Sequence, residues 1–139
     1  MDVATQPYYT HGLLSLYYIP RHIYAILFNA PTTVSGFPYF KPSPNGLGLF
    51  FTTPALLYMF RANLKDKYVL PALLSILLPL ALGMTYGVTG FAQFGYRFSL
   101  DWIPFGIILV MSGMSKPSKL AMFVIALSVL INLWGVLYY

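Results

Sequence analysis

The sequence predicts an all-α fold: a polytopic transmembrane helical bundle of about four spanning helices, with an interfacial or broken helix near the N-terminus. Hydrophobic residues make up 58% of the chain and charged residues only 8%, whereas a soluble domain carries roughly 25% charged residues. A water-soluble packing would leave most of this apolar surface uncovered, so lipid is the expected solvent. Residues 1–139 are therefore expected to form a single membrane domain.

The first apolar segment, 12–30, is interrupted at its centre by Pro20, Arg21 and His22. An arginine at the centre of a spanning helix costs about 2.5–3.5 kcal/mol on insertion scales. Two shorter helices, or one amphipathic helix lying in the interface, would avoid that cost. Arg21 and His22 would then either bind lipid headgroups or extend their polar ends to the interface.

Prolines recur through the next segments, 31–45, 46–61 and 68–86. Residues 31–45 contain several prolines and are expected to form an ordered loop. Segment 46–61 has a proline in its middle and predicts a short kinked span, with a re-entrant element as the alternative. Segment 68–86 predicts another span. Its Pro71 falls in the first turn, where the missing N–H costs little, and Pro79 predicts a kink within the helix.

The last two predicted spans have recognisable starting residues. In 99–115, Ser99 is the expected N-cap, and Asp101 in the first turn suits the positive end of the helix dipole. Segment 119–138 offers about 20 residues, enough to cross a hydrocarbon core of roughly 30 Å. Ser118 is placed to cap this final helix.

The positive charges predict how the chain sits in the cell membrane as a multi-pass protein. They are densest in the connections 61–67 and 116–119, which the positive-inside rule places in the cytoplasm. Two predicted spans separate these connections, so the chain returns to the same side. The loops 31–45 and 87–98 are then expected to be external.

Composition argues against several function classes. The chain has no cysteine, so it can form neither a disulfide nor a thiolate metal site, and its two histidines have no carboxylate cluster beside them. No metal or cofactor is therefore expected. The net charge is +5, but the basic residues lie between apolar segments and do not form a basic stripe. This distribution argues against nucleic acid as a partner. No nucleophile–base pair is visible, so no catalytic residue is assigned.

The external loop and the start of the helix after it carry the best candidate binding site: Gln93, Tyr96, Arg97 and Asp101. Arginine offers a planar, permanently charged group suited to phosphate or carboxylate. One interpretation is an anion site in which Arg97 holds a phosphate. The alternative is an ion pair with Asp101, four residues along, which is easy to form on a helix. The two are compatible, because Asp101 could orient Arg97 for a ligand.

Two further polar residues have weaker assignments. Lys41 lies in the external loop 31–45 and either adds a second cation to the Arg97 site or is an ordinary interfacial lysine. Asn132, in the last predicted span, is expected to form a hydrogen bond between helices.

Three phrases occur in order along the chain: "YIPRHIYAILFNAP", "FPYFKPSPNGLGLFFTTPALLYMFRA" and "TGFAQFGYRFSLDWIPF". Together they resemble the C-terminal part of prokaryotic polytopic membrane proteins related to the C-type (GT-C) glycosyltransferases, over about residues 12–113. The resemblance implies an enzyme that transfers a sugar from a polyprenyl-phosphate carrier on the outer face of the membrane. The family's catalytic carboxylate usually lies in the first external loop, for which this chain has no matching segment. The site residues that the resemblance transfers to this chain are limited to Gln93, Tyr96, Arg97 and Asp101.

The sequence therefore predicts the membrane-embedded, C-terminal portion of a lipid-linked-sugar glycosyltransferase-like protein, with an outer-face site for a lipid phosphate. Its expected partners are the bilayer, a polyprenyl-phosphate-sugar donor, and other helices of a longer parent protein or a partner subunit. The alternative is a small non-enzymatic integral membrane scaffold or assembly protein. A transporter or channel subunit ranks last, since only Ser75, Thr52 and Asn132 suggest a polar pathway.

Overall fold

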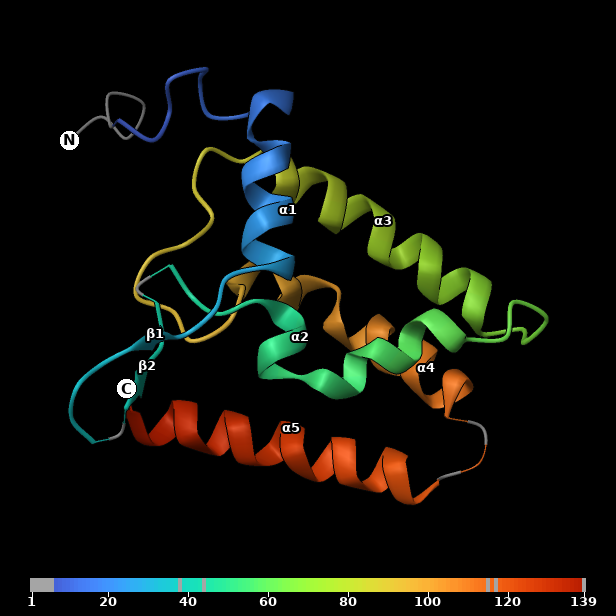
Figure 1. The fold of residues 1–139 in the computed structure, drawn as a ribbon. Helices are drawn as coiled ribbons and strands as arrows, with labels where there is room; N and C mark the ends of the chain where they lie inside the picture. The colour runs from blue at the N-terminus through green and yellow to red at the C-terminus, as the bar shows by residue number, and fades with distance from the viewer. Residues whose placement is uncertain (1–6, 38, 44, 115, 117, 139) are drawn as a thin grey trace.

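The computed structural model describes residues 7–37, 39–43, 45–114, 116 and 118–138. The chain is mostly helical, in agreement with the predicted class, and the described part also contains a short antiparallel ladder in which Thr32 pairs with Lys41. In chain order the elements are the 3₁₀ helix η2 (Leu16–Tyr18), α1 (Ile19–Leu27), β1 (Thr32–Thr33), β2 (Phe40–Lys41), α2 (Leu49–Thr52), the 3₁₀ helix η3 (Pro54–Arg61), α3 (Val69–Thr85), the 3₁₀ helix η4 (Arg97–Asp101), α4 (Ile103–Gly113) and α5 (Lys119–Tyr138) (Figure 1).

Two predicted helices form close to their expected bounds. The segment 119–138 is α5, and the Oγ of Ser118 accepts the backbone N–H of Ala121 at 3.1 Å, which confirms the predicted cap. The segment 68–86 is α3, one residue shorter at each end and helical on both sides of Pro79.

The segment 99–115 differs from its prediction, because α4 begins only at Ile103. Pro104 takes the first turn, a position that suits its fixed φ. The preceding residues form η4 instead. Ser99 is not the cap: its Oγ donates to the carbonyl oxygen of Tyr96 at 2.6 Å, and Trp102 stands at the N-cap position. Asp101 consequently precedes the first turn of α4.

The segment 46–61 is divided into two short helices. The break is at Thr53, whose φ of −138° is not helical, and Pro54 opens the following 3₁₀ helix η3. A residue before proline is disfavoured in the α conformation, so the segment divides at Thr53 and is not one continuous kinked helix. Whether the two short helices together span the membrane stays a prediction. The segment 12–30 is not broken at its centre: Pro20 lies in the first turn of α1, which follows η2 directly and continues through Arg21 and His22 to Leu27.

One helix of the described residues, α5, is long and apolar enough to cross a membrane by length and composition. The 17 residues of α3 and the 11 of α4 extend about 25 and 16 Å at 1.5 Å per residue. Both are shorter than a hydrocarbon core of roughly 30 Å. The residues that the structure describes therefore contain one candidate span, and the four-span bundle stays a prediction.

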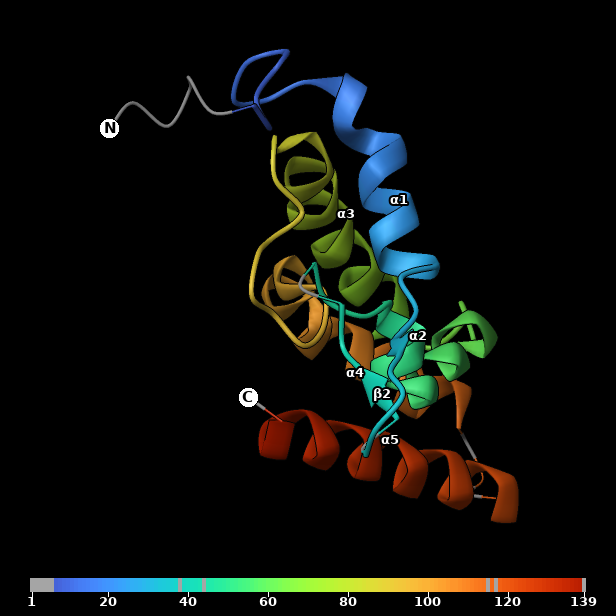
Figure 2. The ribbon, with the colours of Figure 1, turned by 60° about the vertical axis from the view of Figure 1, so that its left-hand side comes forward.

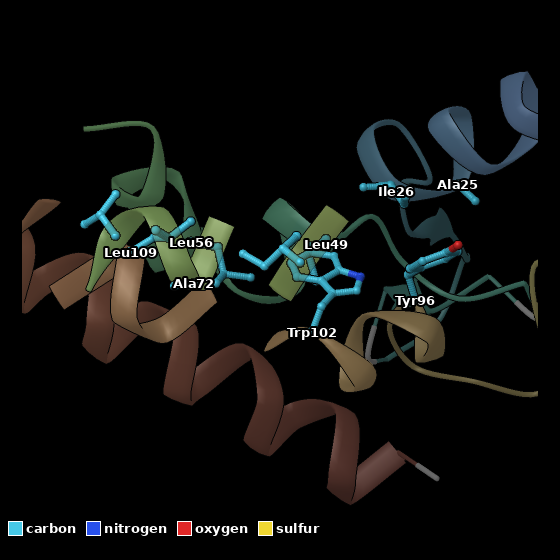
Figure 3. Close-up of a cluster of buried hydrophobic side chains, with 10 residues drawn as sticks. Ala25, Ile26, Leu49, Leu56, Ala72, Tyr96, Trp102 and Leu109 are labelled. Carbon is cyan, nitrogen blue, oxygen red and sulfur yellow. The ribbon is translucent and has the colours of Figure 1, made fainter. Parts of the chain in front are cut away.

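The hydrophobic core lies between α1, α2, η3, α3 and α4 (Figure 3). Its buried members include Leu49, Leu56, Ala72, Trp102 and Leu109. Helix α5 contributes a different kind of face. Its buried residues are the small Ala121, Ser128 and Gly135, seven positions apart, while its large apolar side chains are mostly exposed. Small residues of this kind let helix backbones approach closely, as in membrane proteins.

The connections gather at two ends of the molecule (Figures 1 and 2). At one end, the loop after η3 meets the end of α4, where the backbone N–H of Asn63 donates to Ser112 Oγ at 3.2 Å. At the other, the loop after β2 meets the segment before η4, where the N–H of Leu47 donates to the carbonyl oxygen of Phe94 at 2.7 Å. Helix α1 runs across the direction of α5 in both views.

Candidate functional site

Gln93 holds the segment between α3 and η4 to the rest of the fold. Its side-chain Nε2 donates to the carbonyl oxygens of Asn45, at 2.8 Å, and Thr89, at 3.0 Å. Its Oε1 accepts the backbone N–H of Arg97 at 3.3 Å. The side chain is only 8% exposed, so removing any of these partners would leave a buried polar group unsatisfied. Gln93 therefore serves the structure of the loop as well as lining the site.

Two glycines make room for this amide. Gly46 has φ +84° and Gly90 has φ +111°, backbone conformations that other residues rarely adopt. A Cβ on Gly46 would lie 2.9 Å from Gln93 Cγ, and one on Gly90 would lie 2.1 Å from Gln93 Oε1. Both glycines are thus required by backbone conformation and by close approach.

Tyr96 is buried and points its hydroxyl toward α1 (Figure 3). The hydroxyl is 2.7 Å from Nδ1 of His22, and His22 Nε2 is 2.8 Å from the carbonyl oxygen of Tyr86. A carbonyl oxygen can only accept, so Nε2 carries the proton and Nδ1 accepts from Tyr96. His22 thus joins α1 to both ends of the segment from Tyr86 to Tyr96.

His22 is fully buried, which corrects the expectation that it binds headgroups or extends to the interface. Burial lowers its pKa from the ordinary value; the hydrogen bond to the Tyr86 carbonyl opposes this shift, and the charge of Arg21 adds to it. Burial also raises the pKa of the Tyr96 hydroxyl. A neutral imidazole and a neutral phenol therefore face each other in the interior.

Arg97 and Asp101 do not form the predicted ion pair. No salt bridge within 4.0 Å joins them, and the Arg97 side chain has no hydrogen-bond partner in the described part of the chain. The four-residue spacing favours contact on an α-helix, but these residues lie on the 3₁₀ helix η4. With about three residues per turn, the fourth residue along is rotated by about a third of a turn.

Arg97 lines a cavity of about 270 Å³, which we call the Arg97 cavity. Helix α5, helix α2 with its C-cap Thr53, and the chain from Gln93 to Ile103 all contribute to it. Its polar lining comes from Thr52, Thr53, Gln93, Ser99 and Asn132, and its apolar lining includes Leu49, Phe94, Leu100 and Ile103. Tyr96 also lines it, so three of the five predicted site residues come together here. A cationic residue beside apolar side chains suits an amphipathic anion.

The remaining predicted residues lie elsewhere or have other partners. Asp101 and Lys41 are both exposed and do not line the Arg97 cavity; Lys41 is on β2. Asn132 forms the predicted contact between helices, because its Nδ2 donates to the carbonyl oxygen of Thr52 at 2.8 Å.

Arg21 has partners that its position in the sequence did not reveal. Its guanidinium donates to the carbonyl oxygen of Gly87 and lies over the ring of Tyr18, 4.9 Å from the centroid. A lipid headgroup and the interface were the two alternatives predicted for Arg21; its guanidinium in addition contacts the protein at Gly87 and Tyr18. A signal was available: a charged residue within an apolar segment needs a partner.

The described residues contain no group of three or more His, Asp or Glu side chains that could hold a metal ion. The imidazole of His22 is fully occupied by Tyr86 and Tyr96. Arg97, which lines the cavity, has a guanidinium chemically suited to contact an anion.

No family model matches the chain, and neither the curated proteins nor the solved structures compared with it give a significant match. The resemblance to C-type glycosyltransferases stays a prediction.

Proposed function

We propose that the chain binds a lipid phosphate in the Arg97 cavity, as the membrane-embedded part of a lipid-linked-sugar glycosyltransferase-like protein. The supporting observation is Arg97, which lines the cavity and whose guanidinium has no hydrogen-bond or ion-pair partner among the residues described. A phosphate offers oxygen acceptors in the geometry that a guanidinium matches. The carrier's hydrocarbon chain would pass the apolar side chains of Leu100 and Ile103.

A second donor for the phosphate is the hydroxyl of Thr53. Its oxygen accepts a hydrogen bond from Asn132 Nδ2 at 3.4 Å, and its own O–H has no acceptor among the described residues. Asn132 is at the same time fixed by the carbonyl of Thr52. The hydroxyl is therefore held next to the cavity with a hydrogen to donate.

The proposed topology follows from the two ends of the molecule. With α5 crossing the membrane, the basic connections 61–67 and 116–119 share one end and are cytoplasmic by the positive-inside rule. The Arg97 cavity and the loops 31–45 and 87–98 are then external. Because α1 runs across the direction of α5, it would lie along the membrane surface. The remaining spans, near 46–61, 68–86 and 99–115, complete the proposed bundle.

Sugar transfer would need a carboxylate that this site does not offer. The acidic residues of the chain are Asp2, Asp66 and Asp101; Asp2 is outside the described residues, and neither of the others lines the Arg97 cavity. We therefore assign the chain a binding role toward the donor phosphate, and the resemblance places the catalytic carboxylate outside the chain.

The test is binding of a short-chain polyprenyl phosphate to the protein in lipid nanodiscs. We expect Arg97→Gln to weaken binding by about 10- to 100-fold, because a charge-assisted hydrogen bond contributes about 1.5–3 kcal/mol. Arg97→Lys should retain part of the affinity, since the charge remains but the two-pronged contact does not. Arg61→Gln, at the opposite end, is the control and should bind as the wild type does.

Equal binding by wild type and both Arg97 variants would overturn the proposal. If Arg97→Gln also prevented the protein from assembling with a partner, the alternative of a non-enzymatic scaffold would gain support. The observation favouring that alternative is the large apolar surface of α5, which the described fold leaves exposed.

A further inference from the structure

A second cavity, of about 420 Å³, lies on the other side of Gln93 from the Arg97 cavity. We call it the Arg21 cavity; its lining includes Tyr8, Arg21, Asn45, Thr89, Gly90 and Phe91. The two cavities share no lining residue. Gln93 separates them, because its side chain lines one while its Nε2 binds the Asn45 and Thr89 carbonyls of the other. The second cavity is thus a distinct place on the protein.

Arg21 is held in this cavity with donors to spare. A guanidinium has five N–H groups, and within the described part of the chain one of them donates a hydrogen bond, to the Gly87 carbonyl. The guanidinium also lies over the ring of Tyr18, whose own hydroxyl donates to the Gly12 carbonyl at 2.8 Å. Contact with the ring is favourable for the cation, and it orients the guanidinium before any ligand arrives.

The charge of Arg21 is not balanced inside the cavity. None of the described lining residues is acidic. The neutral polar groups of Asn45 and Thr89 can donate hydrogen bonds without repelling an anion. The cavity is therefore suited to a negatively charged group, with Arg21 as its main contact.

Two aromatic side chains supply the other part of the site. Tyr8 is 54% exposed and Phe91 is 72% exposed, although both line the cavity. Large exposed rings beside a cavity offer flat surfaces on which an organic ring can pack. A bare inorganic ion would contact Arg21 and leave both rings unused.

We propose that the Arg21 cavity binds an organic phosphate whose phosphate oxygens contact Arg21 and whose ring packs against Tyr8 and Phe91. The ligand can come from two sources that share this chemistry: the headgroup of a phospholipid that carries a ring, or a soluble phosphate ester. The proposal does not depend on the Arg97 cavity or on a polyprenyl carrier.

The probe is phenyl phosphate, titrated by calorimetry into the full chain in nanodiscs of neutral phosphatidylcholine. Arg21→Gln should lower its affinity at least tenfold. Arg61→Gln is the matched control, because Arg61 also lies over a tyrosine ring, 5.8 Å from the centroid of Tyr58, but lines a cavity that contains Asp66. Equal affinity in wild type and Arg21→Gln would overturn the proposal.

A second variant covers the case in which Arg21→Gln fails to fold, since Arg21 also binds the Gly87 carbonyl. Phe91→Ala changes an exposed side chain and should reduce the affinity for phenyl phosphate several-fold while leaving the weaker binding of inorganic phosphate unchanged. If inorganic phosphate bound as tightly as phenyl phosphate, or if Phe91→Ala had no effect, the ring contact would be refuted.

Lipid composition separates the two sources. Nanodiscs containing phosphatidylinositol, whose headgroup carries a ring, should compete with phenyl phosphate if the natural ligand is a lipid. Phosphatidylglycerol at the same charge density should compete less. An absence of competition by either lipid would support a soluble phosphate ester in the same site.

Discussion

Both ends of the molecule carry arginine, but they surround it differently. Arg61 lines a cavity of about 430 Å³ that also contains Asp66. Arg21 and Arg97, at the other end, line cavities whose described linings contain no acidic residue. A carboxylate in the same cavity disfavours a bound anion, whereas a cavity with an arginine and no acidic residue favours one. We therefore expect anion binding at the end that carries Arg21 and Arg97. At the end that carries Arg61, we expect the positive charges to set the orientation of the protein in the membrane.

The hydrogen bonds of the two ends differ in range as well. Near Arg61 several are local, such as that from the backbone N–H of Lys65 to Asn63 Oδ1 at 3.1 Å, although Asn63 also reaches Ser112. At the end that carries Arg21 and Arg97, the His22 side chain forms a hydrogen bond with Tyr96, which is 74 positions away. Such distant pairs form only when the whole fold is in place, so mutations there should affect global stability.

The largest expected effect is that of His22→Leu. The variant leaves the partly buried Tyr86 carbonyl and the buried Tyr96 hydroxyl without their His22 partner. Each costs about 1–3 kcal/mol, so we expect a loss of about 4 kcal/mol in the free energy of unfolding. Denaturant unfolding in detergent measures it. His11→Leu is the control, because His11 is exposed, and it should change stability by less than about 0.5 kcal/mol. Equal losses of stability in His22→Leu and His11→Leu would contradict a special contribution of the buried His22 hydrogen bonds.

A smaller effect is expected for Gly90→Ala. A left-handed residue with a Cβ costs about 1–2 kcal/mol, and displacing Gln93 weakens hydrogen bonds worth about 1 kcal/mol each. The sum is about 3 kcal/mol, measurable by thermal unfolding. Gly36→Ala is the control, since a Cβ there meets nothing within 4 Å. If Gly90→Ala left the stability unchanged, the Gln93 loop would be adaptable and the two cavities would not be rigidly separated.

The smallest effect is the pH dependence due to His22. Its pKa is lowered in the folded state from an unfolded value of about 6.5. Between the folded and the unfolded pKa of His22, the unfolded chain therefore binds more protons than the folded chain. The stability consequently falls as the pH drops below about 6.5 toward the folded pKa. The slope is at most about 1.4 kcal/mol per pH unit. Unfolding midpoints at pH 7.5, 6.5 and 5.5 measure it, and this part of the slope should vanish in His22→Leu. Identical slopes in the two proteins would contradict the assignment.

The parts of the fold that sequence predicts well are those decided by local patterns. Apolar length and a capping Ser118 are sufficient to define α5. Proline moved other boundaries: Pro104 delays the start of α4, and Pro54 divides the segment before α3. Both effects follow from the fixed φ of proline, but whether a proline starts, kinks or divides a helix depends on the packing around it.

The candidate site was predicted in part, and its errors have physical causes. Gln93, Tyr96 and Arg97 do meet at one cavity. The pairing of Arg97 with Asp101 assumed an α-helix where the chain forms a 3₁₀ helix. The bond from Tyr96 to His22 joins residues so far apart that no spacing rule could propose it. A buried polar side chain does need a partner, so His22 alone could have prompted the search for one.

The contacts of His22 also bear on the chain as a polymer. By bonding the Tyr86 carbonyl with one ring nitrogen and the Tyr96 hydroxyl with the other, the imidazole closes the intervening segment into a ring. Closing a loop reduces the conformations available to it, and secreted proteins often achieve this with a disulfide. This chain has no cysteine, so the ring is closed by hydrogen bonds. It can therefore open and reform without any redox chemistry.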